Sequence, residues 1–147
     1  MSEELKKKIT EYLEYHSIAT VATVSAEGKP NASAVEYVND GFTLYFMSMP
    51  KSRKTQDIKK NPVVALTINE SVLDMRGTQG IQYEGKAKPV EDGEQVKKCA
   101  EMFYEKFVIF RLLKWDLTKA LFMEVTPARI DFIDYRKKFG HKEKMEF

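Results

Sequence analysis

The chain has 147 residues, of which 43% are hydrophobic and 31% charged, so we expect one folded domain over residues 1–147 rather than a disordered chain. No apolar stretch approaches the roughly 20 residues of a membrane helix, and the near balance of 24 basic against 22 acidic side chains argues against a nucleic-acid binder. The single cysteine, Cys99, excludes an internal disulfide, and the N-terminus lacks the apolar core of a signal peptide, so we expect a cytoplasmic protein.

The first third of the chain predicts a helix followed by three strands. Ser2 can begin a helix that ends near Tyr15-His16, and apolar residues at helical spacing mark its buried side: Leu5, Ile9, Tyr12 and Leu13. Residues 18–24 and 31–38 have the composition of strands, and Asn39-Asp40-Gly41 is a strong hairpin signal before a third strand at 42–47. Tight turns between consecutive strands predict an antiparallel meander.

A short helix is predicted between Ser52 and Asn61-Pro62, directly after the third strand. Ser52 is a good N-cap, and the free backbone amides behind it suit an anion. Arg53 adds a planar fork of donors and Lys54 a mobile point charge. The helix dipole disfavours both cations there by a few tenths of a kcal/mol, and a bound dianion would reverse that cost. We interpret the three residues as an anion-binding corner, with two merely solvated cations as the alternative.

The rest of the chain predicts further strands around one long helix. Residues 63–68 and 81–90 are expected strands, and a helix is expected to begin at Asp92, with Gln95 completing a capping box. Its buried stripe would be Val96, Cys99, Phe103 and Phe107. Residues 108–115 fit either a loop or a turn of helix. Two last strands are expected at 120–125 and 129–135, and the remaining residues form a tail.

These elements predict an α+β fold that is mainly β. Helices do not alternate regularly with strands, so the six or seven strands are expected to form an antiparallel sheet. Many short antiparallel strands favour closure into a small barrel, because closure removes exposed strand edges.

Several kinds of site are excluded by the sequence. His16 and His141 lack ligand spacing, so we expect no metal centre. The chain has no G-x-S-x-G, Walker or G-x-G-x-x-G motif, which excludes a doubly wound dinucleotide fold. Cys99 falls on the apolar side of a helix, where cysteine behaves as a small hydrophobic residue. No side chain stands out as a general base, so catalytic residues stay unassigned.

The stretch from Ile18 to Gly93 resembles the FMN-binding split-barrel family, whose best-known members are the pyridoxamine 5′-phosphate oxidases. The last strands are similar only loosely. Five short pieces carry the resemblance, and they are specific only in combination: Gly28-Lys29-Pro30, Ser48, Ser52-Arg53-Lys54, Asn61-Pro62 and Gln82 with Glu84-Gly85.

The resemblance implies a six- to seven-stranded antiparallel split β-barrel with flanking helices, and a homodimer that holds two FMN molecules in clefts between its subunits. It assigns Arg53 and Lys54 to the FMN phosphate, with Ser48 and Ser52 as hydroxyl donors. It places the backbone of Ala34, Val35, Glu36 and Tyr37 along the edge of the isoalloxazine ring, and the amide of Gln82 near the flavin. A flavin edge needs both donors and acceptors, and an amide offers both.

The reaction is less specified than the cofactor. The chain ends in FGHKEKMEF and lacks the basic C-terminal motif of pyridoxamine phosphate oxidases, so the resemblance does not extend to their B6 substrate. It implies an FMN-dependent oxidoreductase with an unknown small-molecule substrate or redox partner. Two alternatives stay open: a non-catalytic flavin binder or electron carrier, and a split barrel that binds haem or a deazaflavin. An axial haem ligand would have to be His16, His141, Cys99 or a methionine.

Overall fold

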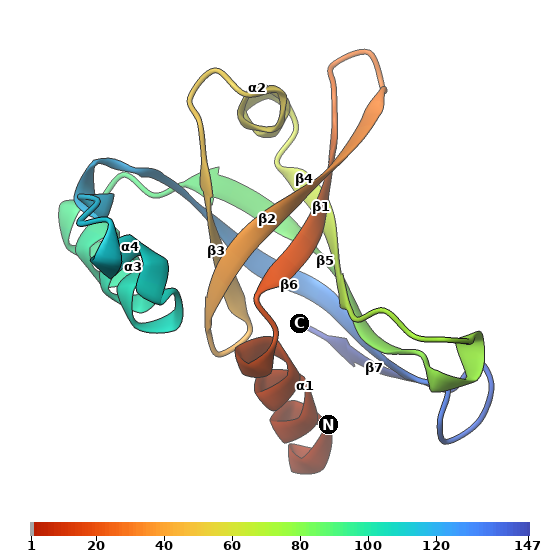
Figure 1. Cartoon of the computed structure of the whole chain (residues 1–147). Helices are drawn as coiled ribbons and strands as arrows, with labels where there is room; N and C mark the ends of the chain where they lie inside the picture. Colours follow the sequence, from red (N-terminus) through yellow and green to blue (C-terminus); the bar gives the residue numbers. More distant parts are fainter. Residues whose placement is uncertain (1) are drawn as a thin grey trace.

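The computed structural model describes residues 2–147 as a strongly curved sheet with helices around it (Figure 1). No helix among these residues has the length and apolar character needed to cross a membrane. The helices and strands, in chain order, are α1 (Glu3–Tyr15), β1 (Ile18–Val24), β2 (Pro30–Asp40), β3 (Thr43–Ser48), α2 (Arg53–Lys60), β4 (Val63–Asn69), β5 (Gln79–Pro89), α3 (Gly93–Lys106), α4 (Val108–Leu112), β6 (Leu121–Asp134) and β7 (Lys142–Glu146), with short 3-10 turns at Met75–Gly77 and Leu117–Lys119.

The strands form one antiparallel sheet that closes on itself. Their order is β3-β2-β1-β4-β5-β6-β7, and β3 also pairs with β6, which closes a six-stranded barrel and leaves β7 as an extra strand. Side chains along β4 alternate strictly between exposed and buried, as the wall of a barrel requires. The predicted fold class, the β1-β2-β3 meander and the limits of the first two helices are confirmed.

The prediction of two separate strands at 120–125 and 129–135 is wrong. Strand β6 is continuous, and Thr126-Pro127-Ala128 forms a bulge opposite Glu84 and Gly85 instead of a turn. Proline is tolerated there because a bulge does not need its missing N–H. Before the bulge β6 pairs with β3, and after it β6 pairs with β7. One strand therefore serves both the closed barrel and the extra strand.

The segment predicted as a tail contains strand β7. Its sequence KEKME has one apolar side chain, Met145, which is 1% exposed and joins the main core. A single buried residue among four charged ones gives no apolar alternation to detect. Lysines on an edge strand of this kind discourage pairing with other chains.

Two apolar clusters support the fold. The larger fills the barrel and includes the buried side of α1. The smaller lies between α3 and the outer side of β2 and β3 and includes Tyr45, Cys99, Phe103 and Phe122. Figure 1 shows α1 and α2 at opposite ends of the barrel, with α3 and α4 beside it.

The start of α3 differs in one detail from the predicted capping box. The side chain of Asp92 accepts a hydrogen bond from the backbone N–H of Gln95, as expected. The Gln95 side chain does not return to Asp92. Its amide nitrogen lies 3.2 Å from the hydroxyl of Tyr45 and 2.5 Å from a carboxylate oxygen of Glu124. Residues 108–115, left open by the sequence, begin with the single helical turn of α4.

Lys106 joins the ends of α1 and α3. Its Nζ lies 3.4 Å from the Leu13 carbonyl oxygen and 4.1 Å from the centroid of the Tyr37 ring. Burial lowers the pKa of Lys106 to about 8.

The lowered pKa predicts a pH-dependent stability. Between about pH 8 and 10 the unfolded chain keeps a proton that the folded chain has released, so the free energy of unfolding should rise with pH. We expect Lys106→Met to remove about 0.5 kcal/mol of this rise between pH 7.5 and 9, after allowance for solvent screening of a half-buried group. Urea unfolding of both proteins at the two pH values measures it, and an identical pH dependence would exclude the contribution of Lys106.

Candidate functional site

Three hydroxyl groups meet where β3 ends and α2 begins. The Ser48 Oγ lies 3.1 Å from the Ser52 Oγ and 2.6 Å from the Thr55 Oγ1, and Thr55 donates to the Met49 carbonyl oxygen at 2.7 Å. Ser52 is the N-cap of α2, and its Oγ accepts from the backbone N–H of Thr55 at 3.4 Å. The structure therefore brings the predicted residues Ser48 and Ser52 together, and it adds Thr55.

The first amides of α2 are available to a ligand. Within residues 2–147, the backbone N–H groups of Arg53 and Lys54 have no hydrogen-bond partner, whereas Gln56 already donates to the Ser52 carbonyl oxygen at 3.1 Å. Free amides at a helix start, with the positive end of the dipole behind them, are the groups that bind phosphate in many proteins.

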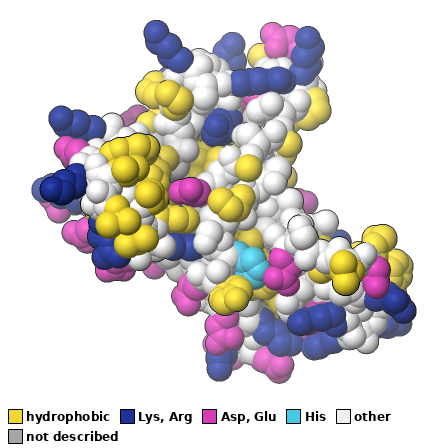
Figure 2. Space-filling model, viewed as in Figure 1, with side chains coloured by type: hydrophobic (Ala, Val, Ile, Leu, Met, Phe, Trp, Pro, Cys, Tyr) yellow, Lys and Arg dark blue, Asp and Glu magenta, His cyan; other side chains and the backbone are white. Residues whose placement is uncertain are grey.

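The two cations of this corner differ in their surroundings. The Arg53 side chain is 54% exposed, its Nη2 lies 3.4 Å from the Pro30 carbonyl oxygen, and its Nε lies 3.9 Å from the Asp57 carboxylate. Asp57 is buried and accepts a hydrogen bond from the Thr23 hydroxyl at 2.8 Å. Lys54 forms no ion pair with any residue of the described chain. Figure 2 shows Lys and Arg side chains gathered at the end of the molecule that carries α2. The donors present fit a phosphate dianion, since two hydroxyls, two free amides and the Arg53 fork lie at one corner and Lys54 is the next residue of the same helical turn.

Next to this corner, one edge of β2 has no neighbouring strand. Strand β3 pairs with β2 only from Tyr37 to Asp40, whereas β1 pairs with it up to Pro30. The backbone N–H of Tyr37 donates to the Ser17 carbonyl oxygen on the β1 side. Because hydrogen bonding alternates along an antiparallel strand, the amides of Ala34 and Glu36 point to the opposite, open edge. These are backbone groups that a flat ring with donors and acceptors along its edge could bind.

The side chains of the predicted β2 residues divide between the two sides of the sheet. Val35 is buried in the barrel, Ala34 is exposed, and Glu36 is half-buried on the same side as Ala34. The distance from Pro30, which Arg53 contacts, to Ala34 is about 13 Å at roughly 3.3 Å per residue. The Arg53 corner and the open edge of β2 therefore belong to one continuous surface.

Gln82 does not lie in this corner. It is exposed on the outer side of β5, and pairing across the sheet places it in a row with Thr67, Thr20 and Ala34. Three strand spacings separate Gln82 from Ala34, which is about 14 Å. Its Oε1 accepts a hydrogen bond from the Nζ of Lys142 on β7 at 3.1 Å. A contact between Gln82 and a ligand at the open edge of β2 would thus have to come from a second subunit.

Sequence reasoning missed two hydroxyl groups near the site. Thr55 is fully buried and bonds to both serines, and the buried Oγ of Ser33 on β2 has no hydrogen-bond partner among residues 2–147. Thr55 follows the N-cap serine by three residues, and this spacing could have identified it. Nothing in the sequence distinguishes Ser33 from other strand serines.

The remaining candidate groups are the metal-ligating side chain types, Cys99 and the two histidines. Residues 2–147 hold no cluster of three or more His, Cys, Asp or Glu side chains suited to a metal ion. Burial raises the pKa of the Cys99 thiol to about 11, so it stays protonated at neutral pH. His16 ends α1, and His141 immediately precedes β7 instead of lying in a tail.

Comparison with known proteins identifies one family and several relatives with the same fold. A family model described as pyridoxamine 5′-phosphate oxidase matches residues 5–134. General stress protein 26 of Bacillus subtilis (strain 168) is 24% identical over 140 residues, which are 92% of this chain and 93% of that protein. The crystal structure of General Stress Protein 26 from Bacillus anthracis str. Sterne is 25% identical, with a TM-score of 0.74 over 98% of this chain and 99% of that one. A heme binding protein from Mycobacterium smegmatis shares the fold, with a TM-score of 0.78 at 14% identity over 99% of this chain and 58% of that one.

Proposed function

The chain belongs to the pyridoxamine 5′-phosphate oxidase family, and from this premise we propose that it is a cytoplasmic FMN-binding oxidoreductase that acts on a small molecule or a redox partner. The observation that carries the proposal is the corner at the start of α2. There the free amides of Arg53 and Lys54 and the hydroxyls of Ser48 and Ser52 lie beside the open edge of β2, and the first turn of α2 carries the two cations Arg53 and Lys54.

The division of labour between cofactor and protein follows from the groups present. When bound, FMN supplies the hydride and electron transfer chemistry. The chain would bind the phosphate through Arg53, Lys54 and the start of α2, and it would fix the ring position through the β2 backbone. No residue is assigned as a general base, so the protein's part is binding and orientation. Steady-state oxidation of NAD(P)H by the FMN-loaded protein separates an enzyme from an electron carrier, since a carrier alone would show no turnover.

The visible spectrum of protein purified without added cofactor tests the choice of cofactor. Bound FMN gives the two-banded absorbance of an oxidised flavin, a deazaflavin absorbs at shorter wavelength, and haem gives a Soret band. A flavin spectrum whose extracted chromophore is FMN supports the proposal. A Soret band without flavin would replace it.

Haem is the second candidate, and one observation favours it. The Nδ1 of His16 lies 2.9 Å from the Tyr12 carbonyl oxygen, which leaves Nε2 as the ring atom without a hydrogen-bond partner among residues 2–147. A cleft of about 340 Å³ beside it contains Tyr12, Tyr15, Phe132 and the cations Lys8, Arg136 and Lys137. Aromatic walls and cations suit a porphyrin with propionates. However, Nε2 is covered and lies 3.6 Å from the Glu70 carboxylate, which an iron atom would have to displace. FMN is therefore the better supported cofactor.

We also propose that the flavin-loaded protein is a homodimer. Five large apolar side chains at and after α4 are 46% to 70% exposed: Val108, Ile109, Leu112, Leu113 and Trp115. Figure 2 shows apolar side chains gathered on the side of the molecule where Figure 1 places α3 and α4. A patch of this kind on a soluble protein usually marks an interface. The open edge of β2 is also too shallow to enclose a ring by itself.

Sedimentation of the flavin-loaded protein tests this assembly. We expect the mass of two chains carrying two FMN molecules, because a second subunit is needed to cover the ring and to bring a Gln82 side chain near it. A monomeric mass with FMN fully bound would contradict the dimer and leave the phosphate site of one chain intact.

A further inference from the structure

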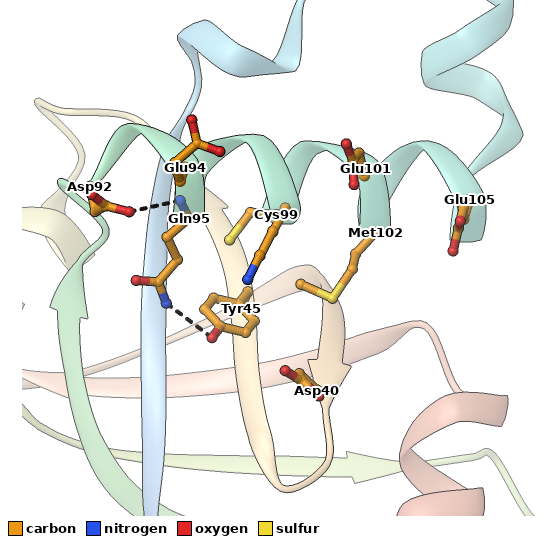
Figure 3. A pocket seen from close by; sticks show the side chains of 10 residues that line it. Asp40, Tyr45, Asp92, Glu94, Gln95, Cys99, Glu101, Met102 and Glu105 are labelled. Carbon is orange, nitrogen blue, oxygen red and sulfur yellow. Dashed lines mark hydrogen bonds between the residues drawn. The ribbon is translucent and has the colours of Figure 1, made fainter.

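A cavity of about 450 Å³ lies between α3 and the β2–β3 hairpin, away from the corner proposed for FMN (Figure 3). Asp40, at the end of β2, lines the lower side of the cavity in Figure 3. Ser48, which belongs to the proposed flavin corner, lies at the other end of the hairpin, where β3 ends. The volume falls within the range of small-molecule sites. The cavity is therefore a separate feature that the proposed flavin site does not use.

The floor of this cavity is aromatic and sulfur-rich. Figure 3 shows Cys99 and Met102 extending from α3 toward the ring of Tyr45 on β3. Tyr45 is 7% exposed, and its hydroxyl is fixed by the Gln95 amide at 3.2 Å. Cys99 is 0% exposed, and its thiol forms no side-chain hydrogen bond within residues 2–147. A ring face and polarisable sulfur atoms favour contact with apolar groups and with organic cations.

The rim of the cavity carries an excess of negative charge. Five carboxylates line it, against the single ammonium of Lys98: Asp40, Asp92, Glu94, Glu101 and Glu105. Asp92 is used as the N-cap of α3, and Glu94 pairs with Lys97 at 3.5 Å. The other three carboxylates form neither an ion pair nor a side-chain hydrogen bond with any residue between 2 and 147. Carboxylates around a partly enclosed apolar floor concentrate negative potential there.

We propose that this cavity binds a small organic cation. Its ammonium or amidinium group would lie toward the acidic rim, in the negative potential of Asp40, Glu101 and Glu105, and its apolar part would lie over Tyr45 and Met102. The three carboxylates are exposed to solvent, so a cation would gain from their negative potential, a neutral ligand would not, and an anion would be repelled. A hard metal ion would gain nothing from the aromatic floor, and residues 2–147 hold no group of three His, Cys, Asp or Glu side chains placed to bind a metal ion, so the combination selects an amine that has an apolar body.

Two matched probes test this proposal: phenethylamine, which is a cation, and 2-phenylethanol, its neutral analogue. The readout is the methyl resonance of Met102 in protein labelled at its methionine methyl groups, assigned with Met102→Leu. We expect phenethylamine to shift this resonance at a lower concentration than the alcohol does. The triple variant D40N/E101Q/E105Q should weaken binding of the amine about tenfold, and Lys98→Gln should strengthen it about twofold, since solvent screens each exposed charge pair.

The control variant E3Q/E4Q/E11Q changes the net charge equally on the exposed side of α1 and should leave the affinity for phenethylamine unchanged. The proposal is overturned if Met102 does not respond to the amine, if the alcohol binds equally well, or if both triple variants weaken the amine alike. FMN binding should be the same in all these variants, so the result stands apart from the proposed flavin site.

Discussion

Replacing Arg53 by alanine is expected to weaken FMN binding by about 1.5–3 kcal/mol, or roughly 10- to 150-fold, the usual contribution of a hydrogen bond to a charged group. The guanidinium is more than half exposed beside the free amides of α2, and Asp57 at 3.9 Å offsets its charge only in part. A phosphate would thus lose a planar two-point donor and one positive charge. Titration of the apoprotein with FMN, followed by flavin fluorescence, measures the change.

Two controls separate this effect from a general change of charge. Lys59→Ala removes one cation from the last turn of the same helix, where a phosphate at the first turn cannot reach, and should leave FMN affinity unchanged. Riboflavin lacks the phosphate, so Arg53→Ala should bind it as the wild type does. Unchanged FMN affinity in Arg53→Ala would remove this residue from the site.

The second large effect is expected at Gly85, where β5 passes the bulge of β6. A Cβ at this position would overlap the Thr126 carbonyl oxygen and lie 3.0 Å from the Tyr83 ring. The carbonyl cannot move away easily, because the adjoining parts of β6 are paired with strands on both sides. We expect Gly85→Ala to lower the free energy of unfolding by about 3 kcal/mol, the upper part of the usual range for overpacking. Chemical unfolding measures the loss.

Gly93→Ala is the matched control for this prediction. Gly93 begins α3, and a Cβ there meets no atom within 4 Å. Alanine should be neutral or stabilise the helix by up to about 1 kcal/mol. If Gly85→Ala were as stable as Gly93→Ala, the close approach of β5 and β6 at the bulge would be wrong.

The parts of the structure that the sequence predicted correctly are those with local causes. Helix α2 begins after Ser52 and ends before Asn61-Pro62. Both limits have local causes, because the Ser52 cap and the missing N–H of proline act within a few residues. Strand β6 was divided wrongly because Pro127 commonly marks a turn, and only pairing with β5 makes it part of a bulge. Strand β7 was missed because it buries a single side chain and depends on the edge that β6 provides.

The candidate site also has parts that the sequence could predict and parts that it could not. Ser48, Ser52, Arg53 and Lys54 lie within seven residues, so their convergence could be predicted from a strand followed by a capped helix. The open edge of β2 could not, since it arises where β3 separates from β2 beyond the Tyr37–Phe46 pair, while the other edge of β3 stays paired with β6 as far as Ser48. The distance of Gln82 from this edge likewise follows from the strand order, which composition and spacing do not determine.

A crystal structure of the protein with FMN bound tests the central claim most directly. We predict phosphate oxygens within hydrogen-bond distance of the Arg53 and Lys54 backbone amides and of the Ser52 hydroxyl, with the ring edge along Ala34 and Glu36 of β2. Electron density for FMN elsewhere, with the start of α2 in contact with solvent alone, would contradict the account.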